Sequence, residues 1–323
     1  MARDDITVGV DFSRDGVRLA AVQVRDDATT VVGTHRYGWP RGAWNAGVIA
    51  KATVVREGIR QAFAEAAFPT RRVVLMIGGA SVNTILELPR MTDAELAEPI
   101  EWEADQHVPP GVATMQLEYR VIEGESDRGS TRVVLHGFTR EAVDEHVAVA
   151  REAGLQPRAV ELEVEALRRL AVSGVDAGDR PLAVLRASST DVAVLGLRRG
   201  EVVFDHTLPS TSDAETVAAV GRALKRFEAT HAGNEIEQVL VAGPDAAAWD
   251  AVLRADGSFV VERLLPRRIA RAQGVGALDA YATAIGLALP GPPMQTAGKP
   301  QRPAGLWSRL TRTLRGTTPR NSS

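Results

Sequence analysis

The sequence contains no cysteine among its 323 residues, which excludes disulfide bonds, cysteine–zinc sites and thiol nucleophiles. It also lacks an apolar run near the roughly 18 residues of a membrane-spanning helix, because its best run, Ala280–Leu289, stops at Pro290. The N-terminus holds only a short apolar stretch after two acids, too little for a signal peptide. We therefore expect a cytoplasmic protein. With 45% hydrophobic and 24% charged residues, the composition excludes wholesale disorder.

Acidic residues are absent from residue 291 onward, where six basic residues occur. The whole chain carries a net charge of −3, so residues 1–290 form an acidic body that is followed by a basic tail. A nucleic-acid-binding protein would present a basic face, and the acidic body argues against that class. We expect no nucleic-acid partner.

The motifs of common catalytic sites are missing as well. The sequence has no Walker loop, HExxH, GxSxG or EF-hand pattern, and its six histidines lack the paired spacing of metal ligands. Three carboxylates, Glu161, Glu163 and Glu165, alternate with apolar residues, which predicts a solvated strand face rather than an acid–base pair. We therefore expect neither a catalytic constellation nor a metal site.

Two stretches of the chain repeat one plan of strand, hairpin, strand, helix and strand. In each stretch, apolar residues alternate as in half-buried strands and then recur at helical spacing. The expected strands are residues 6–12, 17–24, 30–35 and 73–77 in the first stretch and residues 182–185, 192–197, 201–208 and 239–241 in the second. This repetition predicts a duplicated α/β fold with a ligand-binding cleft between its halves.

Residues 89–155 interrupt this plan with a small α+β insertion. Thr92 and Glu95 form a capping-box pattern that predicts the start of a helix, and Pro99 inside that helix predicts a kink. Two strands and a second helix are expected to complete the insertion, at residues 115–122, 132–138 and 140–153.

After Leu289 the composition changes twice. Residues 290–305 hold five prolines and three glycines, which is typical of a linker. Wound as a helix, residues 306–316 gather apolar side chains on one side and arginines on the other, which predicts contact with an anionic membrane surface. The predicted membrane-contact residues are Leu306, Trp307, Arg309, Leu310, Arg312, Leu314 and Arg315. A helix that docks on another protein and an unstructured tail are the alternatives.

The predicted organisation therefore has six parts. They are a first half (residues 1–88), the insertion (89–155), the completion of the first half with the second half (156–289), the linker (290–305), the basic amphipathic helix (306–316) and a disordered end (317–323).

The insertion and its surroundings resemble the PilM family, the actin-like cytoplasmic assembly proteins of type IV pilus machines. The most specific passage is LELPRMTDAELAEPIEWEADQHVPPG, residues 86–111, followed by QLEYRVI, residues 116–122. Residues 153–169 and the closing stretch GALDAYATAIGLAL, residues 276–289, are similar to the same family. The resemblance implies an actin-like α/β fold of two duplicated ribonuclease-H-like halves with a small inserted SHS2-like domain. FtsA and the cytoplasmic part of GspL are related proteins.

The resemblance also implies a degenerate nucleotide site. Three glycine-rich turns of the family correspond to residues 9–13, 185–187 and 242–246. The residues carried over as nucleotide ligands are Gly9, Asp11, Ser13, Arg186 and Gly243. The first turn has Ser13 in place of a glycine, the second has lost its acid at Leu185, and Pro244 removes a backbone donor from the third. We expect no ATP hydrolysis and leave ATP binding open, with Arg186 either a phosphate ligand or part of a salt bridge.

In the PilM family, the short cytoplasmic N-terminus of PilN binds in a groove beside the inserted domain. The resemblance places Leu88, Ile100, Trp102 and Gln106 nearest to that groove, although plain core packing would also account for Ile100 and Trp102. It thus implies a scaffold of a type IV pilus or related type II secretion machine, at the inner face of the cytoplasmic membrane, with a PilN-type partner and pilus motor ATPases as further partners. The alternatives are an FtsA-like membrane-tethered division protein and, less favoured, an actin-fold ATPase or sugar kinase.

Overall fold

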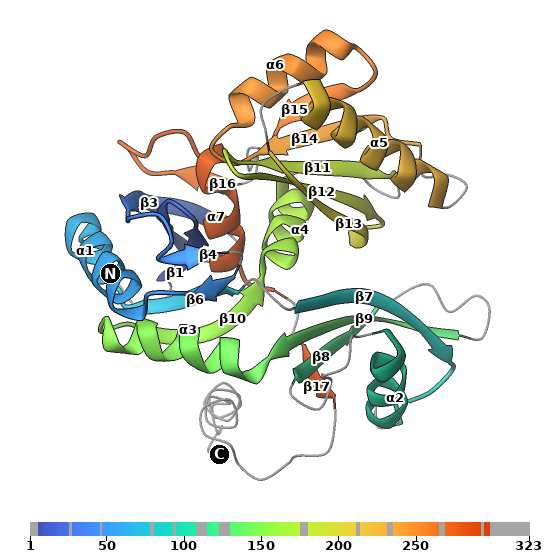
Figure 1. The fold of residues 1–323 in the computed structure, drawn as a ribbon, viewed down its shortest axis with the longest axis horizontal. Coiled ribbons are helices and arrows are strands. Elements are labelled where there is room, and N and C mark those ends of the chain that lie inside the picture. Colours follow the sequence, from blue (N-terminus) through green and yellow to red (C-terminus); the bar gives the residue numbers. More distant parts are fainter. Residues whose placement is uncertain are drawn as a thin grey trace, which may run out of the picture.

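The computed structural model describes residues 6–25, 28–45, 47–77, 81–92, 95–107, 115–122, 130–174, 180–210, 214–230, 235–264, 269–291 and 294–297. Two large β-sheets form the two halves of the molecule, and a smaller sheet lies beside them (Figure 1). The amphipathic segment predicted at residues 306–316 lies outside the described residues. No helix in the described ranges is both long enough and apolar enough to cross a membrane.

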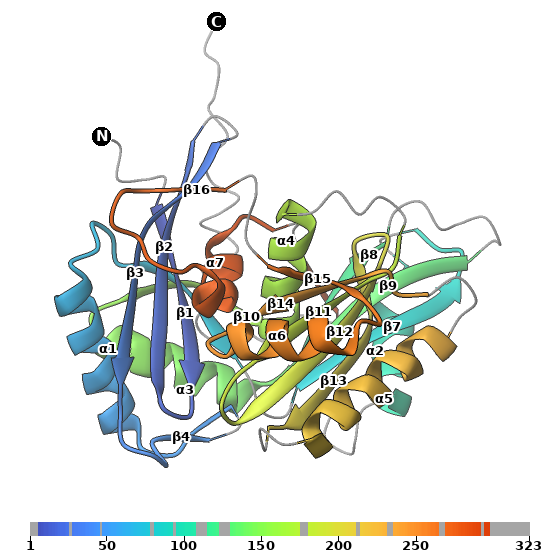
Figure 2. The same ribbon diagram turned by 90° about the horizontal axis from the view of Figure 1, so that it is seen from above.

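The first sheet has the strand order β10-β6-β1-β2-β3-β16. Its strands are β1 (Ile6–Ser13), β2 (Gly16–Arg25), β3 (Ala28–Gly38), β6 (Arg72–Ile77), β10 (Gln156–Leu162) and β16 (Ile269–Arg271). Strands β1, β2 and β3 are antiparallel neighbours, whereas β6 runs parallel to β1 and β10 runs parallel to β6. The short hairpin of β4 (Trp44–Asn45) and β5 (Val48–Ile49) leads into helix α1 (Ala52–Ala66), which covers one face together with α3 (Arg140–Glu152) (Figure 2).

The second sheet repeats this arrangement in the order β13-β12-β11-β14-β15. Its strands are β11 (Leu182–Ala187), β12 (Asp191–Arg198), β13 (Glu201–Pro209), β14 (Gln238–Ala242) and β15 (Val260–Arg263). Strands β11, β12 and β13 are antiparallel, and β14 and β15 follow β11 in parallel. Helices α5 (Ala214–Thr230) and α6 (Ala246–Asp256) pack on its outer face. The predicted duplication is confirmed, with two additional parallel strands in the first sheet, β10 beside β6 and β16 beside β3, and one in the second, β15.

Two helices lie between the large sheets (Figure 2). They are α4 (Glu163–Gly174) and α7 (Ala282–Ala288), the latter entered through a 3₁₀ turn at Asp279–Tyr281. The two helices pack so closely that a Cβ atom on Gly286 would lie 2.0 Å from the carbonyl oxygen of Ala166. Inward-facing residues of both sheets join these helices in one hydrophobic core.

The third sheet has the order β17-β8-β9-β7. Its strands are β7 (Ser81–Pro89), β8 (Met115–Val121), β9 (Ser130–Thr139) and β17 (Gln295–Ala297). Helix α2 (Ala97–His107) packs on one face of this sheet, burying Ile100 and Ala104 together with Leu96 in a separate small core. This unit is the α+β insertion that the sequence predicts.

The predicted boundaries of the insertion are wrong on three points. Strand β7 begins at Ser81 and pairs with β9 along its whole length, so it belongs to the insertion and not to the first half. Helix α3 contacts α1 and β6 and buries Val143, Val147 and Ala150 in the core of the first half. The predicted linker contains β17, which pairs with β8. Local periodicity predicts an element but not the sheet that it joins.

The predicted kink at Pro99 is also wrong. Pro99 is the third residue of α2, so it lies in the first turn, where a helical amide has no partner within the helix. The next amide, that of Ile100, bonds normally to the carbonyl oxygen of Leu96 at 3.0 Å. The predicted contact between Thr92 and Glu95 is present, because the amide of Thr92 donates to Glu95 Oε2 at 2.8 Å. Glu95 lies two residues before Ala97, the first residue of α2.

Candidate functional site

The first part of the candidate site is the β1–β2 hairpin, where Ser13 replaces the expected glycine. The Ser13 hydroxyl donates to Asp15 Oδ1 at 2.7 Å and accepts from Arg18 Nη1 at 3.1 Å. Arg36 on β3 donates to Asp15 Oδ2 at 2.7 Å. Burial alone would raise the pKa of Asp15, but the Ser13 hydrogen bond and the two arginines hold it below its ordinary value. The polar groups of this hairpin therefore satisfy one another.

The second part is the β11–β12 hairpin, which carries Arg186. The Arg186 guanidinium donates to Glu163 Oε2 at 2.6 Å from one nitrogen and forms an ion pair with Asp191 through another. Thr190 Oγ1 donates to Asp191 Oδ2 at 2.9 Å. Burial opposes the charge of Arg186, but its two carboxylate partners keep its pKa above the ordinary value. Arg186 thus forms the salt bridges that were one of its two predicted roles, and the other role, as a phosphate ligand, stays a prediction.

Asp11 lies on β1 of the first hairpin, two residues before Ser13. Burial raises its pKa to about 7, the Glu163 carboxylate adds to the rise, and Arg18 and Arg186 oppose it. Groups from both halves therefore act electrostatically on this one carboxyl. The side chain of Glu163 also accepts a hydrogen bond from Thr283 Oγ1 on α7 at 3.0 Å.

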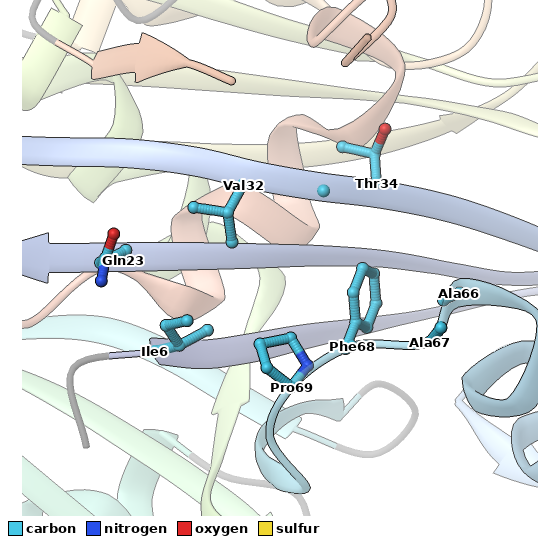
Figure 3. Close-up of a pocket in the computed structure, with 9 residues that line it drawn as sticks. Ile6, Gln23, Val32, Thr34, Ala66, Ala67, Phe68 and Pro69 are labelled. Carbon is cyan, nitrogen blue, oxygen red and sulfur yellow. The ribbon is translucent and has the colours of Figure 1, made fainter. Parts of the chain in front are cut away.

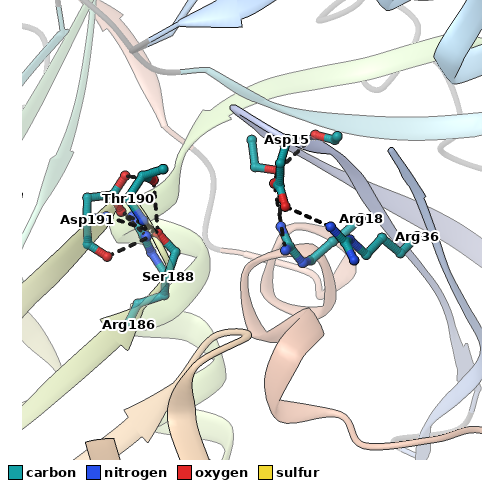
Figure 4. A network of polar contacts seen from close by, with 9 residues as sticks. Asp15, Arg18, Arg36, Arg186, Ser188, Thr190 and Asp191 are labelled. Atoms are coloured by element: carbon teal, nitrogen blue, oxygen red, sulfur yellow. Dashed lines mark hydrogen bonds and ion pairs between the residues drawn. The ribbon is translucent and has the colours of Figure 1, made fainter. Parts of the chain in front are cut away.

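We call this group of residues the two-hairpin cluster. Figure 4 draws most of its polar contacts on their respective hairpins. Its members are Asp11, Ser13, Asp15, Arg18, Arg36, Glu163, Arg186, Ser188, Thr190, Asp191 and Thr283. The sequence singled out Asp11, Ser13 and Arg186, but it gave no signal for the others, which come together only through the fold.

The third predicted turn, at Gly243, is tied to the second half instead. Gly243 has a φ of +95°, and a Cβ atom there would lie 2.2 Å from the carbonyl oxygen of Ala187. Its amide donates to the carbonyl oxygen of Asp279 at 2.8 Å. The amide of Asp245 donates to the carbonyl oxygen of Ala187 at 3.2 Å. Glycine is required here by backbone packing, and its amide is already bonded within the chain.

Gly9 has a packing role as well. It lies in the middle of β1, and a Cβ atom there would be 1.8 Å from the carbonyl oxygen of Ala284 in α7. The structure therefore places Gly9 against helix α7 and not among the polar residues of the two-hairpin cluster.

The four predicted partner residues are separated by the fold. Leu88 and Ile100 are buried in the core of the insertion, whereas the Trp102 side chain is 65% exposed. Two residues along a helix correspond to a rotation of about 200°, so Ile100 faces the sheet and Trp102 faces outward. The alternative prediction of plain core packing is therefore confirmed for Ile100 and wrong for Trp102. The side chain of Gln106 lies outside the described residues.

The three alternating carboxylates are not a solvated face. Each forms an ion pair with an arginine: Glu161 with Arg169, Glu163 with Arg186, and Glu165 with Arg168. Strand β10 ends at Leu162 and α4 starts at Glu163, so the alternation spans a strand and a helix. The spacing of Glu165 and Arg168, three residues apart, is the sequence signal for a helical pair that the strand interpretation missed.

A buried network connects the insertion to both halves. Arg120 on β8 binds Glu201 on β13 through two hydrogen bonds of 2.8 and 2.7 Å, and its guanidinium lies 3.9 Å from Glu165 on α4. His136 on β9 lies 3.6 Å from Glu165, and burial lowers its pKa to about 4 despite that carboxylate. The insertion is therefore anchored by charge as well as by apolar packing.

A pocket of about 340 Å³ lies at the end of α1, on the side of the first sheet that this helix covers (Figure 3). Its lining is mostly apolar, with Val32 on β3 lying near Phe68 and Pro69, which follow α1. None of the residues predicted as ligands or partner contacts lines it.

Comparisons with known proteins agree with this architecture. The family described as "Type IV pilus assembly protein PilM" matches residues 9–209. A solved structure described as the "PilM-PilN type IV pilus biogenesis complex" superposes with a TM-score of 0.70 at 18% identity, covering 87% of this chain and 97% of that one. The cytoplasmic domain of EpsL, an inner membrane component of the type II secretion system of Vibrio cholerae, gives a TM-score of 0.50 at 10% identity, covering 88% and 96%.

A search of curated proteins finds no match. The structural neighbours establish the actin-like fold and nothing further, because their sequence identities to this chain are only 18% and 10%. The family match spans more than half of the chain, and it includes the passage on which the resemblance rested. The chain belongs to the PilM family of type IV pilus assembly proteins.

Proposed function

We propose that this protein is a non-catalytic scaffold of a type IV pilus or related type II secretion machine, which binds the cytoplasmic N-terminal segment of a PilN-type inner-membrane protein. Family membership and the similarity to a PilM that was solved with PilN support this proposal. The observation that carries it is the exposure of Trp102 on the insertion. Exposed tryptophan is uncommon on a protein without a partner, and tryptophan is enriched among the residues that dominate binding energy.

The contacts of the insertion support α2 as the docking element. Ile100 and Leu88 fix the helix to its sheet from below, and the Arg120–Glu201 pair fixes that sheet to the second half. Trp102 is therefore presented on a rigid element, which lowers the entropic cost of binding an extended segment. Of the predicted partner residues with described side chains, Trp102 is the one we assign to direct contact.

Trp102→Glu is expected to weaken binding of a synthetic peptide with the N-terminal sequence of the cognate PilN-type protein by about thirty-fold, because a hot-spot aromatic contributes roughly 2 kcal/mol or more. Isothermal titration calorimetry measures the affinity. The matched control is Val260→Glu, since Val260 is 60% exposed on β15 of the second half. An unchanged affinity for Trp102→Glu, or an equal loss in both variants, would contradict the proposed contact.

We infer that the two-hairpin cluster does not hydrolyse ATP. Support comes from the missing acid at Leu185 and from the contacts of its neighbours. The guanidinium of Arg186 already binds two carboxylates, and the amide of Gly243 already donates to a carbonyl oxygen. Phosphate oxygens need free donors, and a carboxylate must be free to hold Mg²⁺ through water. The residues present do not fit a hydrolytic nucleotide site, and ATP binding stays an open prediction.

Purified protein is accordingly expected to release phosphate from Mg-ATP no faster than buffer, in a colorimetric phosphate assay. An actin-fold ATPase would exceed the uncatalysed rate by about 10⁶-fold or more, so the two outcomes are far apart. Asp11→Ala is the control, because Asp11 is the one acid kept from the family turns. Magnesium-dependent phosphate release that disappears in Asp11→Ala would contradict the inference.

We also propose a peripheral location at the inner face of the cytoplasmic membrane, since a PilN-type partner would hold the scaffold there. Contact of the C-terminal tail with anionic lipid and contact with pilus motor ATPases stay predictions. The tail residues assigned to the membrane lie outside the described residues.

A further inference from the structure

The outer face of α2 combines an exposed aromatic ring with negative charge. Glu98, Glu101 and Trp102 are all exposed, and their spacing of three and four residues places them on one side of the helix. The opposite side, with Ile100 and Ala104, is buried against the sheet. Neither glutamate forms an ion pair with any residue that the structure describes. We call these three residues the Trp102 face.

The chain itself passes beside α2, on the side of the sheet, before its C-terminal tail begins. Strand β17 pairs with Leu117–Tyr119 of β8, and it contacts α2 (Figure 1). Eight residues, 298–305, then separate β17 from the amphipathic segment at residues 306–316. An extended chain of that length spans about 26 Å, whereas an eleven-residue helix such as α2 is about 16 Å long. The segment can therefore reach every part of the Trp102 face.

The tail complements this face, because it offers positive charge to the two glutamates and apolar side chains to the Trp102 ring. Residues 306–316 hold three leucines, one tryptophan and three arginines, with no acid. At helical spacing the apolar residues share one side, Arg309 and Arg315 lie nearest to its two edges, and Arg312 lies opposite. Apolar side chains can cover the Trp102 ring while arginines approach Glu98 and Glu101. Each such pair is weak when exposed, but the tether supplies an effective concentration in the millimolar range.

We propose that residues 306–316 dock on the Trp102 face of α2 in the same chain. The tail then covers the surface that a PilN-type segment would use, so that such a segment must displace it. The docking itself is independent of the proposed function, whereas this competition rests on it. Because the same apolar residues would face α2 or lipid, docking on α2 and insertion into a membrane exclude each other.

The absence of cysteine makes a direct test straightforward in the full-length chain. Ser308→Cys supplies a single labelling position between apolar and basic residues of the tail, and a fluorophore there reports tail motion by its anisotropy. A docked tail tumbles with the 34.5 kDa protein, whereas a free tail moves fast. We expect a high anisotropy that falls with added salt, because the ion pairs are exposed.

Two variants of the Trp102 face test where the tail docks. Trp102→Ala is expected to lower the ratio of docked to free tail by about thirty-fold. The double variant Glu98→Lys with Glu101→Lys is expected to lower it by about ten-fold. The matched control is Glu235→Lys, a charge reversal at an exposed acid of the second half, which should leave the anisotropy unchanged.

Binding to vesicles of phosphatidylcholine and phosphatidylglycerol at 3:1 distinguishes docking of the tail on α2 from its insertion into a membrane. We expect the double variant to bind them at several-fold lower lipid concentration than the parent, because its tail is released. A low anisotropy in the parent, or a high anisotropy in all variants, would overturn the proposal, as would equal lipid binding by parent and double variant. Titration with the PilN-type peptide tests the proposed function separately, so either idea can fail alone.

Discussion

Gly286→Ala is expected to lower the free energy of unfolding by about 3 kcal/mol, the upper end of the range for an overpacked core. The added methyl group would lie 2.0 Å from the carbonyl oxygen of Ala166, so α7 and α4 must separate. The carbonyl oxygen of Gly286 also accepts a hydrogen bond from Arg169 Nε at 3.1 Å, which a shift of α7 would disturb. Urea unfolding followed by circular dichroism measures the change.

Gly221→Ala is the matched control, because an added Cβ atom at Gly221 in helix α5 would meet no atom within 4 Å beyond its neighbours and the backbone of its own helix. Alanine there should raise stability by about 0.5–1 kcal/mol through helix propensity alone. The two glycine-to-alanine changes are therefore expected to differ in sign. A neutral or stabilising Gly286→Ala would show that α4 and α7 are not in close contact, and with it the packing of the two halves would be wrong.

The duplicated plan could be predicted because it is written in local periodicity. Each half carries its alternating strands and its helix in the same order, and a repeat seen twice constrains the sheet topology. The role of Gly9 could not be predicted in this way. A glycine before an acid at the first turn is expected near phosphates, yet here it makes room for Ala284 in α7, which is 275 residues further along the chain.

The burial of the alternating carboxylates could not be predicted from the sequence either, because it also depends on residues far away along the chain. Whether Glu165 faces solvent depends on β8 and β9 of the insertion, which place Arg120 and His136 against it. Those residues precede it by several tens of positions, and alternation says only which face a side chain occupies. The exposure of Trp102 could have been predicted from helical periodicity. Ile100 and Ala104 define the buried side of the helix, and Trp102 lies about 200° away from Ile100.

Loss of Arg120 is expected to destabilise the protein more than any single surface change. Arg120→Ala should lower the free energy of unfolding by about 3–5 kcal/mol, because it leaves Glu201 without its cation in a buried setting and leaves Glu165 with Arg168 alone. Their side chains are 14% and 9% exposed. The insertion should then loosen from both halves, since this arginine bridges β8 to β13 and α4. Urea unfolding gives the magnitude, and hydrogen exchange locates the loosening.

Arg60→Ala is the matched control for this change. Arg60 also binds a glutamate through two hydrogen bonds, of 2.9 and 2.7 Å to Glu57, but both side chains are about half exposed on α1. Water replaces such a pair with little loss, so its unfolding midpoint should stay unchanged. Adding Glu201→Gln to Arg120→Ala should recover part of the lost stability, because it removes one uncompensated charge. If Arg120→Ala behaves like Arg60→Ala, the insertion is not anchored by this network, and the rigid presentation of Trp102 loses its physical basis.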